Sequence, residues 1–134
     1  MKPMLSNVGA RLSAILAVAV AVPVLLAASR PVHLELSKSA PADKSTVDAV
    51  SEVRLWFSEA PMDMGARTVS LRIVGTDGKV IATGDAVRDP KDAKVYSLAL
   101  PRGLAPAAYT IEWQTMAPDG DVARGRFGFT VAAR

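Results

Sequence analysis

Hydrophobic and polar residues alternate along most of the chain after Arg30. The alternation has a period of two, which is typical of strands with one buried and one exposed face, and not the helical period of about 3.6. Val53, Leu55 and Phe57, for example, alternate with Arg54 and Trp56. This pattern predicts seven short strands, near residues 34–39, 53–57, 69–73, 80–84, 95–100, 109–113 and 127–131.

Turn-forming residues separate the predicted strands, as in Gly75-Thr76-Asp77-Gly78 and Pro118-Asp119-Gly120-Asp121. Short strands joined in this way predict an all-β fold, an Ig-like antiparallel β-sandwich or barrel. Tyr109 begins a late strand after the corner that contains Pro106. This position favours a tyrosine corner, in which the phenol binds the backbone a few residues upstream and fixes a Greek-key crossing. The alternative is that Tyr109 is an ordinary half-buried strand residue.

The N-terminal segment, residues 1–29, has a different composition from the rest of the chain. Lys2 and Arg11 are its only charged residues, and a long uncharged run separates Arg11 from Arg30. The run ends in Ala27-Ala28-Ser29, which is typical of a secretory signal peptide and its cleavage site. We therefore expect a signal peptide, forming a helix, over residues 1–29 and one domain over residues 30–134. A retained inner-membrane anchor is the alternative, since the uncharged run approaches the length of a membrane span.

Charge and residue counts exclude several functional classes. The whole chain carries 16 basic and 13 acidic residues, and two of the basic residues belong to the predicted signal peptide. The small remaining excess does not indicate a nucleic-acid-binding protein. The chain has no cysteine and a single histidine, His33, which excludes disulfides, cysteine metal sites and sites with several histidines. No catalytic constellation or phosphate-binding loop is present, so we do not expect an enzyme.

Three blocks of the sequence together form a pattern that is typical of a known family. The first block is His33-Leu34-x-Leu36-x-x-Ser39-x-Pro41-Ala42-Asp43, and the second runs from Val53 to Pro61 as VRLWFSEAP. The third extends from Leu104 to Val131 and contains Tyr109, Trp113, Asp119-Gly120-Asp121 and Gly125-x-Phe127-x-Phe129. In this order the three blocks resemble the CopC family of periplasmic copper-resistance proteins, and the resemblance covers residues 33–134. It implies a Greek-key β-barrel or sandwich that handles copper in the periplasm, with copper as the bound ion and an inner-membrane copper transport protein as a further partner.

The resemblance also implies a copper(II) site. The ligands of the family are the mature N-terminal amine, the imidazole of the first residue, a loop aspartate and a loop histidine, and the matching side chains here are His33, Asp119 and Asp121. Asp121 stands where the family pattern has histidine, which replaces a nitrogen donor preferred by copper(II) with a carboxylate. Cleavage after Ser29 would also leave Arg30-Pro31-Val32 ahead of His33, so that the terminal amine could not chelate together with its ring.

Each candidate ligand has a simpler interpretation. His33 alone is an ordinary surface residue at the start of a strand, and Asp119-Gly120 is a common turn sequence. Met62 and Met64 are candidates for copper(I), which prefers thioether sulfur, with Met116 as a third ligand if the fold brings it near. Their alternative role is packing. The sequence therefore predicts a periplasmic copper-binding protein of copper resistance, homeostasis or trafficking, and the alternative is a non-enzymatic interaction module whose metal site is weak or lost.

Overall fold

The computed structural model describes residues 33–133, and the predicted signal peptide lies outside the described residues. Within them the chain is all-β, with no helix long and apolar enough to cross a membrane. One turn of 3₁₀-helix, η1 (Gly65–Arg67), follows β3. The strands are β1 (Leu36–Ala40), β2 (Thr46–Val47), β3 (Glu52–Phe57), β4 (Val69–Gly75), β5 (Val80–Asp89), β6 (Asp92–Ala99), β7 (Ala107–Met116) and β8 (Val122–Val131).

All seven predicted strands are present, and the structure adds β2 to them. β2 consists of Thr46 and Val47 alone, which is too short to show a period of two. β5 extends to Asp89, well past its predicted end at Gly84. The sequence does not reveal this extension, because three of the five added residues are charged (Asp85, Arg88 and Asp89) and the segment therefore resembles a loop.

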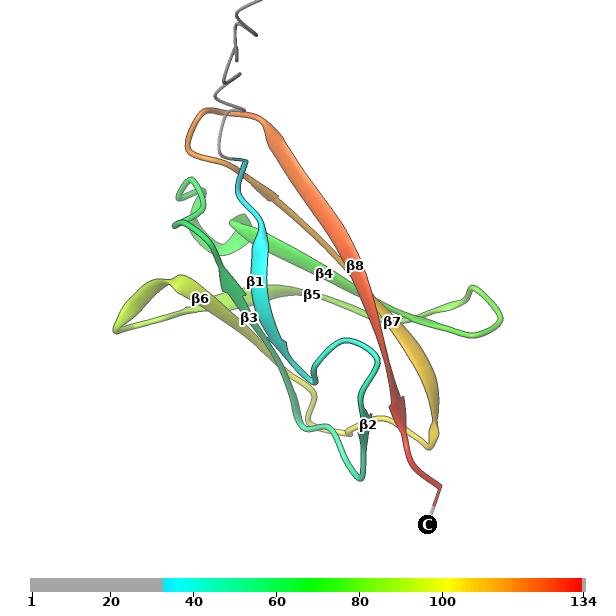
Figure 1. Cartoon of the computed structure of the whole chain (residues 1–134). Helices are drawn as coiled ribbons and strands as arrows, with labels where there is room; N and C mark the ends of the chain where they lie inside the picture. The colour runs from blue at the N-terminus through cyan, green and yellow to red at the C-terminus, as the bar shows by residue number, and fades with distance from the viewer. Residues whose placement is uncertain (1–32, 134) are drawn as a thin grey trace, which may run out of the picture.

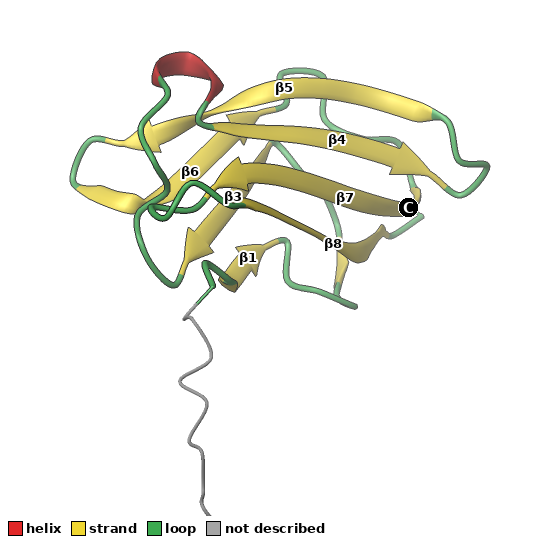
Figure 2. Ribbon diagram, turned by 90° about the horizontal axis from the view of Figure 1, so that it is seen from above, coloured by secondary structure: helices red, strands yellow, loops and turns green. Residues whose placement is uncertain are grey.

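The strands form one curled sheet in the order β1-β3-β6-β5-β4-β7-β8-β2. β5 pairs with β4 over residues 80–86 and with β6 over residues 87–89, and in this way it connects one layer of the sandwich to the other. Figure 2 shows β5, β4, β7 and β8 following one another across one layer. The order β7-β4-β5-β6 is a Greek key, as predicted. The pairing is antiparallel except between β2 and β8, which run parallel.

The core fills the space between the two layers (Figure 1). Val53 and Leu55 of β3, Ile73 of β4 and Ile111 of β7 have no exposed surface. A large aliphatic side chain buried in this way contributes about 1.5–3 kcal/mol to stability. The alternating burial along β3 and β7 is the packing that the sequence pattern predicted.

The tyrosine corner is confirmed. The Tyr109 hydroxyl donates a hydrogen bond to the carbonyl oxygen of Ala105. The ring itself is buried and lies against Phe129, with 5.9 Å between the ring centroids. This hydrogen bond fixes the β6–β7 connection at the point where it enters β7.

Candidate metal centre

The three predicted metal ligands lie together at one end of the sandwich. His33 precedes β1, while Asp119 and Asp121 belong to the loop that joins β7 to β8; in Figure 1 this loop lies beside the first described residues. One ligand atom from each of the three side chains lies within 4.8 Å of the other two, and all three side chains are exposed. The fold thus brings together residues from opposite ends of the domain sequence.

Backbone hydrogen bonds fix the shape of the β7–β8 loop. The Ala117 N–H donates to the Asp121 carbonyl at 2.8 Å, and the Gly120 N–H donates to the Ala117 carbonyl at 2.9 Å. Gly120 has a φ of 88°, a conformation that favours glycine. Ala117 is almost fully buried, which anchors the loop to the core. The two aspartates therefore occupy defined positions in a short, well-bonded loop.

The turn interpretation of Asp119 is confirmed, and it is compatible with metal binding. The Asp119 Oδ1 atom accepts a hydrogen bond from the Asp121 N–H at 3.0 Å. A carboxylate has two oxygens and several lone pairs, so the turn leaves one oxygen of Asp119 for a cation. Within residues 33–133 the carboxylate of Asp121 accepts no hydrogen bond, and it is therefore available as a ligand.

The chain next to His33 is attached to the end of β3. The Glu35 N–H donates to the Ser58 hydroxyl at 2.9 Å, and the Ser58 N–H donates back to the Glu35 carbonyl at 2.8 Å. Leu34 is buried in the core. Ser58 was not among the candidate residues, although it belongs to the second block of the resemblance. Its role is to position the segment that carries His33.

The geometry is close to that of a metal site. Bonds from nitrogen or oxygen to a first-row metal ion such as zinc are about 2.0–2.2 Å long, so two ligand atoms on one ion lie at most about 4.4 Å apart. The three ligand atoms lie within 4.8 Å of one another, which is close to this span. Rotation of the exposed side chains can adjust these distances, and two carboxylates beside one imidazole attract a cation. The donor set nevertheless has one nitrogen fewer than the pair of imidazoles implied by the resemblance.

The methionine candidates lie at the same end of the fold. The Met62 N–H donates to the Met116 carbonyl at 2.9 Å, so Met116 does lie beside the loop that carries Met62 and Met64. Met62 and Met116 are half-buried and Met64 is exposed. Thr68 holds this loop, since its hydroxyl accepts from the Met64 N–H at 2.9 Å and donates to the Gly65 carbonyl at 2.7 Å.

A buried tyrosine lies near the methionine loop. Tyr96 of β6 is 4% exposed, and burial raises the pKa of its phenol. The charge of Asp63 raises this pKa further, while Arg88 and a hydrogen bond with Thr68 oppose the rise. The neutral phenol is thus the form that the folded protein favours.

Comparison with known proteins agrees with this architecture. The family model of the CopC domain matches residues 36–132. The chain belongs to the CopC domain family. Protein YobA of Escherichia coli K12 is 30% identical over 100 residues, which cover 74% of this chain and 78% of YobA, and YobA of Shigella flexneri matches equally well.

Two solved structures resemble this one. CopC from Methylosinus trichosporium OB3b has a TM-score of 0.66 and 24% sequence identity, over 75% of this chain and 94% of its own. PcoC from Escherichia coli, described as a methionine-rich copper resistance protein, has a TM-score of 0.55 and 24% identity, over 74% of this chain and 98% of its own. At this level of identity the likeness shows the fold.

Proposed function

We propose that this CopC domain is a non-enzymatic periplasmic copper-binding protein that serves copper resistance, homeostasis or trafficking. In this proposal His33, Asp119 and Asp121 bind copper(II) as cargo. The convergence of their three ligand atoms within 4.8 Å is the observation that carries the proposal. The two structural relatives support it, because one is named CopC and the other is described as a copper resistance protein.

The proposed site suits an ion that binds and leaves. All three side chains are exposed, so the ion can exchange with solvent or with another protein without any opening of the core. Met62, Met64 and Met116 are the proposed ligands for copper(I), a softer ion that prefers thioether sulfur. Both proposed sites lie at one end of the sandwich, where one surface would serve both oxidation states.

Calorimetric titration with copper(II), in the presence of glycine as a competing ligand, tests the proposal. We expect binding at one ion per chain, with loss of at least about tenfold in affinity in His33→Ala and in Asp121→Asn. Asp85→Asn is the matched control, because Asp85 is an exposed carboxylate on β5, outside the triad. Binding no tighter than that of glycine, or equal losses in the control, would contradict the copper(II) site.

The position of the mature N-terminus decides whether a further nitrogen donor is present. The intact mass of the exported protein measures it directly. A chain that begins at His33 would place the terminal amine beside the imidazole, and a chain that begins at Arg30 would leave only the side-chain ligands. The same measurement tests cleavage of the signal peptide, since a retained segment would add the mass of Met1 to Ser29.

The alternative function is an interaction module without a working metal site. It is favoured by Asp121, which replaces a nitrogen donor, and by the turn that already occupies one oxygen of Asp119. Copper tolerance measured in cells that carry His33→Ala separates the two functions. Unchanged tolerance would support the interaction module, whereas lost tolerance with normal protein levels would support copper binding. An inner-membrane copper transport protein stays a prediction as partner in both cases.

A further inference from the structure

The outer edge of β8 is open along its first half. β8 pairs with β7 over its whole length, but with β2 only at Thr130 and Val131. The second half of the edge is covered further by the loop before β2, because the Lys44 N–H donates to the Gly128 carbonyl at 2.6 Å. Within residues 33–133 no such partner covers the edge over residues 122–126.

The alternation of backbone directions identifies the free groups. The N–H groups of Gly128 and Thr130 point away from β7, since they bind Asp43 Oδ1 at 3.1 Å and the Ser45 carbonyl at 2.9 Å. Successive residues of an antiparallel strand point their backbone groups to opposite sides. The N–H and C=O groups of Arg124 and Arg126 therefore point to the open edge, where they form a template for an added strand.

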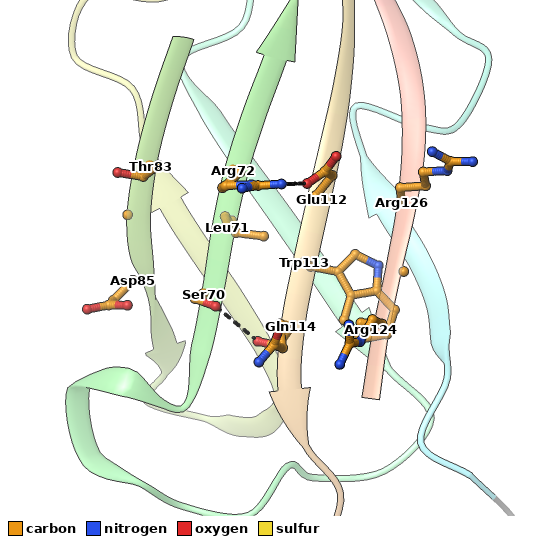
Figure 3. Close-up of a pocket in the computed structure, with 12 residues that line it drawn as sticks. Ser70, Leu71, Arg72, Thr83, Asp85, Glu112, Trp113, Gln114, Arg124 and Arg126 are labelled. Carbon is orange, nitrogen blue, oxygen red and sulfur yellow. Dashed lines mark hydrogen bonds and ion pairs between the residues drawn. The ribbon is translucent and has the colours of Figure 1, made fainter. Parts of the chain in front are cut away.

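The side chains along this edge are positively charged and uncompensated. Arg124 and Arg126 are exposed, and neither forms an ion pair with any residue of the described chain. Arg126 lies opposite Glu112 of β7, but the Glu112 carboxylate instead accepts a hydrogen bond from Arg72 Nε at 3.0 Å. Figure 3 shows the pair of Arg72 and Glu112, and it shows the Arg126 side chain directed away from β7.

The charge distribution disfavours two other occupants. A second copy of β8, paired edge to edge, would bring four arginines together and would be repelled. A small anion in the adjacent groove of about 720 Å³ is also disfavoured, because Asp85 and Glu112 line that groove together with the arginines. Within residues 33–133, the edge over residues 122–126 combines free backbone groups with two guanidinium groups that form no ion pair.

We propose that an extended acidic segment of a partner protein adds to the sheet as a strand along residues 122–126. Its backbone would bind the free groups of Arg124 and Arg126, and its carboxylates would pair with the two guanidinium groups. Asp121 immediately precedes β8, so the added strand would end beside the proposed copper site. The inference goes beyond the proposed function and does not require a bound metal.

The probe is a fluorescent octapeptide of alternating glutamate and threonine, compared with the same peptide in which lysine replaces glutamate. Fluorescence anisotropy with the metal-free protein should show binding of the acidic peptide only, weakened by high salt because exposed charges are screened. Arg124→Glu combined with Arg126→Glu should weaken binding by at least about tenfold. Arg102→Glu combined with Arg67→Glu is the control with equal net charge, since both residues are exposed and neither belongs to the edge over residues 122–126; Arg102 lies beside Val131, at the opposite end of β8. Equal thermal stability of the variants ensures that folding is not the cause.

Amide hydrogen exchange tests whether the peptide binds as a strand. We expect slower exchange at the amides of Arg124 and Arg126 in the complex, and unchanged exchange at Gly128 and Thr130, whose N–H groups are already bonded. Peptide binding without protection of Arg124 and Arg126 would overturn strand addition. Absence of binding, equal binding of the lysine peptide, or equal loss in the control variant would overturn the docking surface as a whole.

Discussion

Replacement of Gly125 by alanine tests the packing of the hairpin that carries the proposed metal loop. Gly125 of β8 lies opposite Trp113 of β7 in the strand register. A Cβ atom added at Gly125 would lie 2.6 Å from Cζ2 and 2.8 Å from Cε2 of the Trp113 indole. Carbon atoms in contact normally lie about 3.5–4.0 Å apart, so either the indole or the strand must move.

The indole has little freedom to move. Trp113 is 7% exposed, and its ring packs edge to face against Phe57 with 5.3 Å between the ring centroids. Overpacking of this kind costs about 1–3 kcal/mol. Glycine within a strand is less stable than alanine by about 0.5–1 kcal/mol, which offsets part of the overpacking cost. We therefore expect Gly125→Ala to lower the free energy of unfolding by about 1–2 kcal/mol. For a domain of this size each kcal/mol lowers Tm by about 4–8 °C.

Urea unfolding followed by circular dichroism measures the effect, and Gly128→Ala on the same strand is the matched control. A Cβ at Gly128 would lie 3.4 Å from the Tyr109 carbonyl oxygen, an acceptable contact, so this variant should be as stable as the parent protein or up to about 1 kcal/mol more stable. Trp113→Phe lacks the indole Cζ2 and Nε1 atoms, and in that background Gly125→Ala should cost little. Equal stability of Gly125→Ala and the parent, or equal destabilisation by both alanines, would refute the reasoning.

Three further predictions concern the metal loop, the pH dependence and the tyrosine corner. Asp121→His supplies a second imidazole, so we expect copper(II) affinity to rise by at least about tenfold in competition titrations; equal or weaker binding would argue against Asp121 as a ligand. Burial raises the pKa of the Tyr96 phenol in the folded state above its usual value. As the pH rises, the unfolded chain therefore loses this proton before the folded protein does. The stability contributed by Tyr96 declines above about pH 10 for this reason. Urea unfolding at a series of pH values should show a shallower decline for Tyr96→Phe, and an identical decline would contradict the prediction. Tyr109→Phe removes the hydrogen bond to Ala105 and should lower the free energy of unfolding by about 0.5–1.5 kcal/mol without changing copper affinity; a loss of affinity would show that the corner also supports the site.

The strand pattern was predictable because each strand buries one face. Val53, Leu55 and Phe57 are buried, whereas Arg54 and Trp56 face outward and are half-buried, as their alternation predicted. Alternation did not predict β2, because β2 is too short to show it. It also did not predict the second half of β5, where most side chains are exposed. Local pattern thus predicts a strand wherever its two faces differ in environment.

Strand order and the site required more than local pattern. No periodicity places His33 beside Asp119 and Asp121, because their proximity depends on how β1 and the β7–β8 hairpin reach the same end of the sandwich. The resemblance to the CopC family supplied these three positions. Ser58 and Thr68 could not be selected in advance, since their roles are hydrogen bonds to the backbone N–H groups of Glu35 and Met64.

The packing of the β7–β8 hairpin explains the residues of the third sequence block. Trp113 needs a residue without a side chain opposite it, and Gly125 provides that space. Tyr109 begins the same strand and fixes its entry into the sheet. The spacing of Tyr109, Trp113 and Gly125 is therefore explained by the packing of one hairpin, which positions Asp119 and Asp121 at its tip.

The replacement of histidine by Asp121 bears on how the proposed site would work. A copper(II) ion held by one imidazole and two exposed carboxylates would be bound less tightly than by two imidazoles, and it would exchange more readily. Ready exchange suits a protein that passes its ion to a partner, and less well a protein that stores it. The open edge of β8 begins at the residue after Asp121. An acidic strand docked there would bring new carboxylate ligands to the ion at the point where its own ligands are weakest.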